Sequence, residues 1–135
     1  MMTPDQQNKV IQYIIVRNDM DSMTPGRCAA QAAHAANQCV NVLKATGHNV
    51  LCEEWEKQTP FGFGTTIVLQ ANMSMINLIE DALYSKNVLP FGVMEDPEYH
   101  IADGSVVHLL PVSTVLWILG RKSEVEPYVS HLELL

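Results

Sequence analysis

Basic residues are scarce in this chain, which has 8 lysines and arginines against 15 aspartates and glutamates and a formal net charge of −7. Proteins coated in nucleic acid are usually basic, so this balance excludes a surface that is cationic throughout. The deficit is uneven: residues 1–50 hold four basic and three acidic groups (net +1), whereas residues 51–135 hold four basic and twelve acidic groups (net −8). A polyanion could therefore bind only a surface built by the N-terminal part.

Cysteines and long apolar runs are also few. Cys28, Cys39 and Cys52 form no C-x-x-C pair, which argues against a disulfide framework or a structural zinc site and favours reduced, buried thiols. No apolar run approaches the roughly 18 residues that span a bilayer. The first ten residues lack the basic start and apolar core of a signal peptide. We therefore expect a cytoplasmic protein without a membrane segment.

The 135 residues contain no repeat and no linker rich in proline, glycine or serine, so one domain over residues 1–135 is expected. Patterns typical of strands occur at residues 10–16, 65–69, 91–94 and 114–119. Patterns typical of helices occur at residues 25–45, 50–57 and 75–84, with caps at Thr24 and Ser74, and after a capping box of Ser123 and Glu126. This order predicts an α/β fold: a three-layer α/β/α sandwich with a small, mixed four-stranded sheet in which the nearly continuous apolar run 10–16 is central.

One predicted helix has an unusual composition. Its stretch TPGRCAAQAAHAANQCV, residues 24–40, is rich in alanine but carries four long polar side chains. At 100° per residue, Arg27, Gln31, His34 and Gln38 fall within an arc of about 60°. Small residues on another side would let the helix lie close to the sheet, so this polar stripe is expected to face outward or into a cleft beside the sheet.

The polar stripe lies near the start of the helix, where free N–H groups and the positive end of the dipole suit a phosphate or a developing oxyanion. His34, two turns further on, could act as a general base or a hydrogen-bond donor. The alternative interpretation is a solvated helix face with one incidental histidine.

The segment IIVRNDMDSMTPGRCAAQAAHAA resembles the start of the second (archaeal and eukaryotic) type of peptidyl-tRNA hydrolase. In that family a strand ending in Val-Arg is followed by Asp-Leu, a Met-Gly-Lys-Gly-Lys loop and Ala-Ala-Gln-x-x-His-Ala-Ala. The last five residues, HLELL, are similar to the family's His-Leu-Lys-Leu-Leu terminus, and TTIVLQ, IADG and TVLWILG occur between in the family's order. The resemblance covers almost the whole chain.

The resemblance implies an enzyme that hydrolyses the ester between a peptide and the terminal ribose of tRNA, without metal or cofactor, and it suggests a homodimer. Such chemistry needs a positioned water, a group that takes its proton, and donors for the oxyanion. By position, His34 matches the motif histidine, and a carboxylate from Asp19, Glu95 or Asp96 would position water with it. The substrate-binding residues that the resemblance implies are Arg17, Arg27, Gln31, Ser105 and Thr114.

The sequence departs from the family at several of these positions. Pro25 replaces the first lysine of the loop, Glu98 replaces an arginine and Tyr99 a threonine, and extra residues occur within 105–113. Because the changed positions lose positive charge or a site hydroxyl, we expect weak, salt-sensitive tRNA binding, confined to a face around Arg17, Arg27 and Lys44. A non-catalytic binding protein on the same scaffold is the alternative. A hydrolase that acts on a less anionic acyl substrate is a third interpretation.

Two other groups of residues give weaker evidence of function. The spacing of His100, Asp103 and His108 matches no strong metal-binding signature. The FGFG at residues 61–64 could stack bases, but it lacks a lysine and a following helix start, which favours a turn into the second strand.

Overall fold

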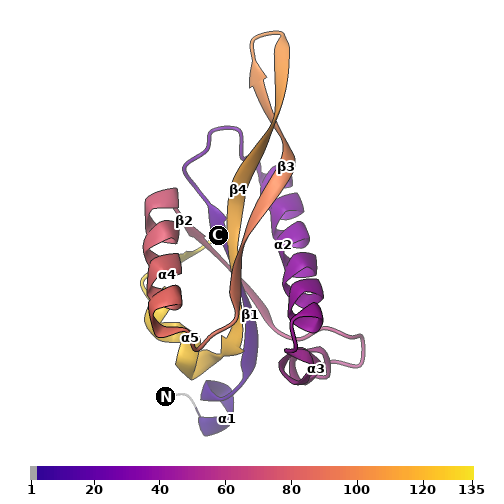
Figure 1. The fold of residues 1–135 in the computed structure, drawn as a ribbon, viewed down its shortest axis with the longest axis vertical. Coiled ribbons are helices and arrows are strands. Elements are labelled where there is room, and N and C mark those ends of the chain that lie inside the picture. The colour runs from indigo at the N-terminus through magenta and orange to yellow at the C-terminus, as the bar shows by residue number, and fades with distance from the viewer. Residues whose placement is uncertain (1–2) are drawn as a thin grey trace.

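A five-stranded mixed sheet runs through the middle of the molecule in the computed structural model, which describes residues 3–135 (Figure 1). The strands are β1 (Val10–Arg17), β2 (Thr66–Ala71), β3 (Phe91–Asp103), β4 (Val106–Arg121) and β5 (Glu133–Leu134). They lie in the order β3-β4-β1-β2-β5, with β1 parallel to β2 and antiparallel to β4. The predicted central position of residues 10–16 is confirmed. The sheet has five strands instead of four because the C-terminal residues pair with β2.

Helices cover both faces of this sheet, which confirms the predicted three layers. They are α1 (Pro4–Gln7), α2 (Pro25–Ala45), α3 (Asn49–Glu56), α4 (Met73–Lys86) and α5 (Lys122–Val129). Figure 1 shows α2 and α3 on one face, called here the α2 face, and α4 and α5 on the other, called the α4 face. No helix within residues 3–135 is long and apolar enough to cross a membrane.

Alternating residues of β1 supply the cores of both layers. Ile11, Tyr13 and Ile15 pack with α4 and α5, whereas Ile14 and Val16 pack with α2 and α3. A strand buried on both faces reads as a continuous apolar run, which is why the sequence predicted it well. The expectation of buried thiols is confirmed for Cys39 and Cys52, while Cys28 is half-buried; the three thiols are free.

Helix α2 begins and ends as predicted. The side chain of Thr24 accepts a hydrogen bond from the Arg27 N–H at 3.4 Å, and Pro25 occupies the first turn. Its buried residues are spaced four apart, at Gln31, Ala35, Cys39 and Leu43. Small side chains among them allow the helix to lie close over β1 and β4.

Two predicted caps are wrong. Asn72, and not Ser74, caps α4, because its side-chain oxygen accepts a hydrogen bond from the Met75 N–H at 2.8 Å. The helix therefore starts at Met73, two residues before the predicted start at residue 75. The capping box of Ser123 and Glu126 is absent, and α5 starts at Lys122 without a side-chain cap.

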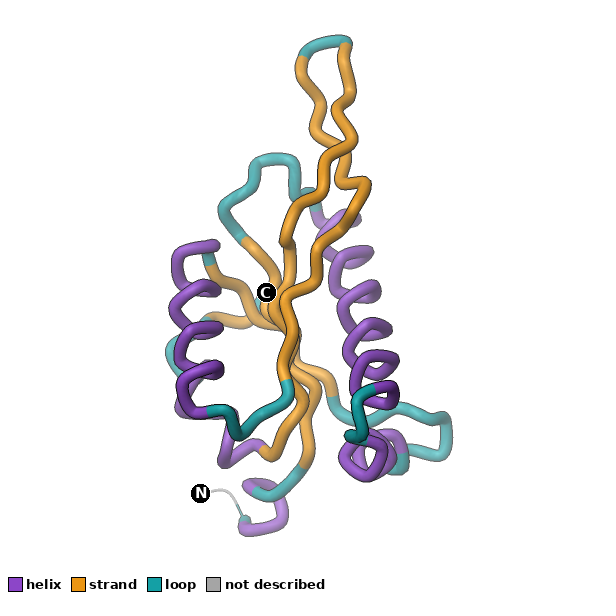
Figure 2. The backbone as a smooth tube through the Cα atoms, viewed as in Figure 1, coloured by secondary structure: helices purple, strands orange, loops and turns teal. Residues whose placement is uncertain are grey.

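The last two long strands extend beyond the sheet as a hairpin (Figures 1 and 2). The strands predicted at 91–94 and 114–119 are correct but too short, because β3 and β4 stay paired out to Asp103 and Val106. The extra residues at 105–113 form the turn and the outer part of β4. We call residues 99–110, which lie beyond the second shift in register, the arm.

Candidate functional site

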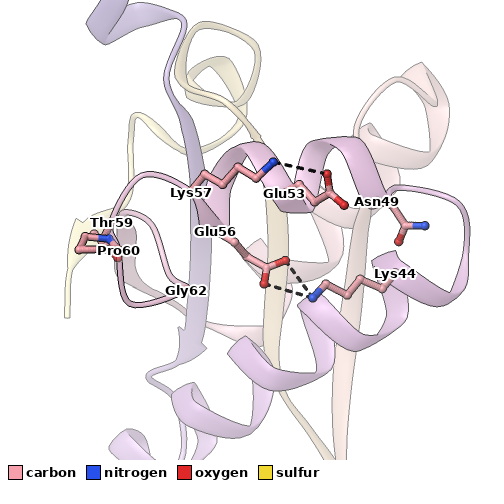
Figure 3. Close-up of a pocket in the computed structure, with 8 residues that line it drawn as sticks. All are labelled: Lys44, Asn49, Glu53, Glu56, Lys57, Thr59, Pro60 and Gly62. Carbon is pink, nitrogen blue, oxygen red and sulfur yellow. Dashed lines mark hydrogen bonds and ion pairs between the residues drawn. The ribbon is translucent and has the colours of Figure 1, made fainter.

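An open hollow of about 720 Å³ lies at the C-terminal end of α2 (Figure 3). Its lysines face carboxylates: Lys44 lies 2.9 Å from Glu56, and Lys57 lies 3.9 Å from Glu53. Lys44 is also 17 residues from Arg27, which is about 25 Å along a helix. The structure therefore separates Lys44 from the phosphate-binding face that was predicted to include it.

The polar stripe of α2 faces the edge of the sheet where β3 and β4 lie, which is one of the two orientations expected. Gln38 accepts a hydrogen bond from the indole N–H of Trp117 at 2.9 Å. Gln31 is buried, and Arg27 is partly covered. Of the four side chains in the stripe, His34 alone is exposed. The imidazole ring of His34 is therefore the group of the stripe that is open to solvent water.

Gln31 links two strands through its side-chain amide. The amide nitrogen donates to Asp96 Oδ2 at 2.7 Å, and the amide oxygen accepts from the Thr114 hydroxyl at 2.6 Å. With 4% of its surface exposed, Gln31 needs both partners, because an unsatisfied buried amide is costly. We call Thr114, Gln31 and Asp96 the polar chain.

The polar chain favours the ionised form of Asp96. The pKa of Asp96 is lowered chiefly by the hydrogen bond from Gln31, against the opposing effect of burial. The Glu98 N–H, which donates to Asp96 Oδ1 at 2.9 Å, and the positive charges of His34 and His100 lower it further. The structure therefore brings one carboxylate, Asp96, to Gln31, which lies one turn before His34 on α2.

A β-bulge directs Thr114 toward Gln31. Met94 pairs with Val115 and Glu95 pairs with Ser113, so Thr114 is an extra residue on β4 with no partner on β3. A bulge rotates the strand, and Thr114 then points to the α2 face like its neighbour Val115. In a regular strand, neighbouring side chains would point to opposite faces.

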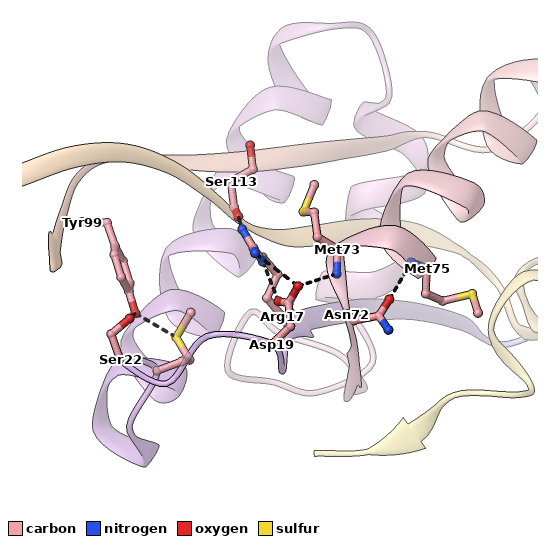
Figure 4. Close-up of polar contacts among 9 residues, drawn as sticks. Arg17, Asp19, Ser22, Asn72, Met73, Met75, Tyr99 and Ser113 are labelled. Atoms are coloured by element: carbon pink, nitrogen blue, oxygen red, sulfur yellow. Dashed lines mark hydrogen bonds and ion pairs between the residues drawn. The ribbon is translucent and has the colours of Figure 1, made fainter.

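Arg17 and Asp19 form a separate cluster near the start of α4 (Figure 4). Arg17 Nε donates to Asp19 Oδ1 at 2.8 Å, and Arg17 Nη1 donates to the Ser113 carbonyl at 3.2 Å. The Met73 N–H donates to Asp19 Oδ2 at 3.1 Å, and the pKa of Asp19 is lowered chiefly by the hydrogen bond from Arg17. This carboxylate anchors the end of β1 to the helix start, so the structure does not join it to His34.

Arg27 is held against the arm by one of its guanidinium nitrogens. Nη1 donates to the carbonyl oxygens of His100 at 2.6 Å and Ser22 at 3.3 Å, and the guanidinium lies 5.7 Å from the centre of the Tyr99 ring. The Tyr99 hydroxyl shares a 3.0 Å hydrogen bond with the Ser22 hydroxyl. Within residues 3–135, the guanidinium hydrogen bonds all come from Nη1. The edge formed by Nε and Nη2 can therefore grip an anion through two N–H groups.

A cleft of about 540 Å³ opens beside this arginine. It lies between the loop after β1, the start of α2 and the arm, and it is lined by Met20, Asp21, Ser22, Thr24, Arg27, Ile101 and Ala102. Arg27 is the one cation in this lining and Asp21 the one carboxylate, so the cleft offers a ligand a single cationic group beside apolar side chains.

Two of the predicted site residues lie elsewhere. Ser105 is exposed in the turn at the tip of the arm, and the whole length of the hairpin separates it from Thr114. Glu95 is exposed and precedes Asp96 on β3, outside the polar chain. Sequence reasoning missed the partnership of Asp96 with Gln31 and the anchoring of the arm by Tyr99. Pro97 and Pro111, which interrupt the pairing of β3 and β4, were the available signal of an irregular ladder.

The fold and the site define an α/β protein in which a helix-borne histidine, a fixed carboxylate and an arginine lie along one edge of a mixed sheet. The sequence model of the family described as Peptidyl-tRNA hydrolase PTH2 matches residues 10–135. This match runs from the first strand to the last residue, and the chain belongs to that family. The resemblance seen in the sequence is thus confirmed. A comparison with curated proteins found no match.

Proposed function

We propose that this protein hydrolyses the ester bond of peptidyl-tRNA, releasing free tRNA and peptide. The observation that carries the proposal is the polar chain, which holds the Asp96 carboxylate against Gln31, one turn of α2 before the exposed His34, in a chain of this family. Thr114 and Gln31 act by positioning Asp96. A positioned acid–base pair is what attack by water on an ester requires.

In the proposed reaction, His34 accepts a proton from water as the water oxygen attacks the ester carbonyl. Asp96 stabilises the resulting imidazolium, since its pKa is held low and it stays ionised. The bond between the carbonyl carbon and the ribose oxygen then breaks, and the proton passes to that oxygen. The free edge of Arg27 binds a phosphate of the tRNA terminus or the oxyanion.

Weak, salt-sensitive binding of tRNA remains part of this proposal. Arg17, which was predicted to bind phosphate, is paired with Asp19 at 2.8 Å, and Lys44 is paired with Glu56 at 2.9 Å. Few cations are left to neutralise phosphates, so the affinity should be low, and its fall with rising salt should have the shallow slope of a few phosphate contacts. The homodimer and the cytoplasmic location stay predictions.

A non-catalytic binding protein is the second candidate. The observation that favours it is that both oxygens of Asp96 already accept hydrogen bonds, from Gln31 and from the Glu98 N–H. A carboxylate used to hold β3 against α2 would be retained for structural reasons even after catalysis was lost.

Release of tRNA from peptidyl-tRNA distinguishes these candidates. His34→Ala should lower turnover at least ~100-fold, the usual minimum for a positioned acid–base group. Its folding should not change, because the side chain is exposed and alanine favours a helix. His48→Ala, at an exposed position outside the site, is the matched control and should keep full activity. Arg27→Lys should be milder than Arg27→Ala, which should mainly weaken substrate binding.

No release of tRNA by the native protein at high concentration would contradict hydrolysis and favour the binding protein. If His34→Ala unfolds the chain, as judged by circular dichroism, the histidine is structural and its catalytic role is wrong. Equal activity of the His34→Ala and His48→Ala variants would also reject the proposed base.

A further inference from the structure

The arm carries apolar side chains that the rest of residues 3–135 leaves exposed. The exposed fractions are 53% for Val106, 57% for Val107, 54% for Leu109 and 45% for Leu110. A two-stranded ribbon is only marginally stable in water by itself. Exposed apolar residues on such a ribbon therefore indicate a surface that a ligand or a partner covers.

Strand pairing assigns these side chains to the two faces of the arm. Residues directly opposite each other in an antiparallel pair share a face, and Tyr99 pairs with Leu110 while Ile101 pairs with His108. The Tyr99 hydroxyl reaches Ser22, so this inner face is turned toward the loop after β1 and the start of α2. The outer face holds the pair of His100 with Leu109, whereas Ala102, which pairs with Val107, also lines the cleft.

The inner face continues the cleft at Arg27. Ile101 lines that cleft opposite the loop after β1, and Leu110 lies on the same face one pair closer to the sheet. A ligand whose anionic end binds Arg27 can thus extend along an apolar wall. Residues 99–110 hold one carboxylate, Asp103, and no lysine or arginine, so the arm offers no cation to a phosphate backbone.

We propose that the inner face of the arm binds the peptide half of peptidyl-tRNA and selects apolar residues next to the ester. This inference rests on the proposed function. The arm has no lysine or arginine that could bind phosphates of the tRNA, and the peptide is the part of the substrate without phosphates. Ile101 and Leu110 are the specificity-determining residues.

Binding of non-hydrolysable substrate analogues tests this selection independently of catalysis. Two analogues would carry the same tRNA joined through an amide to an N-acetylated dipeptide of either leucine or glutamine, which are uncharged and similar in length. The native protein should bind the leucine analogue at least tenfold more tightly, a difference of about 1.4 kcal/mol. Ile101→Asp and Leu110→Asp should reduce this ratio to near one. Leu109→Asp, on the outer face of the same hairpin, is the matched control and should keep the native ratio.

The possible results decide whether the inner face of the arm binds the peptide. Equal affinities in the native protein, or the same loss of preference in Leu109→Asp as in Ile101→Asp, would overturn the proposal. So would tighter binding of a lysine dipeptide analogue, since carboxylates would then be the recognition element. A change in oligomeric state of the Ile101→Asp variant without a change in the ratio would assign the face to a second copy of the chain. A leucine preference without any tRNA release by the native protein would keep the peptide surface and reject the hydrolase.

Discussion

Replacing Gln31 with glutamate tests the polar chain at its centre. The amide nitrogen of Gln31 lies 2.7 Å from Asp96 Oδ2, so a carboxylate there would repel an anion instead of donating to it. Two unit charges about 3 Å apart repel by roughly 5 kcal/mol at an effective dielectric constant of about 20. Because Asp96 is half-buried, we take about half of this value, ~3 kcal/mol, which is a rise of about two pH units in the pKa of the pair.

The pH dependence separates charge repulsion from the loss of a hydrogen bond. A glutamate whose folded pKa is raised above its unfolded value of about 4.3 binds its proton more tightly when folded, so stability falls as the pH rises. The free energy of unfolding of Gln31→Glu should therefore drop by roughly 2 kcal/mol between pH 4.5 and 7. Native Asp96 has a lowered pKa and contributes in the opposite sense, stabilising the fold above its unfolded pKa of about 3.9.

Urea unfolding, followed by the fluorescence of the buried tryptophans Trp55 and Trp117, measures this difference. Gln31→Met is the matched control, because it removes the same hydrogen bonds without adding a charge. Its loss of stability should change little with pH over the same range. Parallel pH profiles for Gln31→Glu and Gln31→Met would refute the placement of Gln31 against an ionised Asp96.

Two further changes test the surrounding fold. Gly92→Ala should lower the free energy of unfolding by about 1–3 kcal/mol, because its Cβ would overlap the buried ring of Trp117. Gly26→Ala is the control: its Cβ meets no atom within 4 Å, so the substitution should be neutral or stabilising. The midpoints of thermal unfolding of the two variants measure the difference. Asp19→Asn should flatten the loss of stability below pH 4, because the lowered pKa of Asp19 beside Arg17 contributes stability that disappears as pH falls; an unchanged acid transition would show that this pair is not formed.

The sequence predicted correctly those helices and strands whose local pattern agrees with their burial in the fold. The β1 run is apolar because both of its faces are buried, and α2 begins where Thr24 and Pro25 place it. The outer parts of β3 and β4 could not be predicted, because residues such as Pro97 and Gly104 resemble a loop and the strand conformation comes from pairing. The start of α4 was displaced because its cap, Asn72, precedes the first apolar position by three residues.

The site was predicted only in part for a related reason. Helical periodicity grouped Gln31 with His34, but it could not show that Gln31 is buried, since that depends on its partners Asp96 and Thr114. The sequence left Asp19, Glu95 and Asp96 open as the carboxylate. The structure pairs Asp19 with Arg17 and brings Asp96 to the helix, because only the latter side chain emerges on the α2 face. The contribution of each residue to catalysis stays a prediction.

The polar chain has a consequence for the order in which the candidate site assembles during synthesis. Its two hydrogen bonds join residues 65 and 83 positions apart, and β4 lies between β3 and β1 in the sheet. Helix α2, with its histidine, is therefore made long before the strand that must insert beside β1 to hold Asp96 in place. Such long-range closure is slow compared with local helix formation. A nascent chain that ends before Arg121 contains α2 and Asp96 but lacks the complete β4 that places β3 in the sheet, and opening of the two strands at this edge would separate Asp96 from Gln31 while β1 and β2 stay paired.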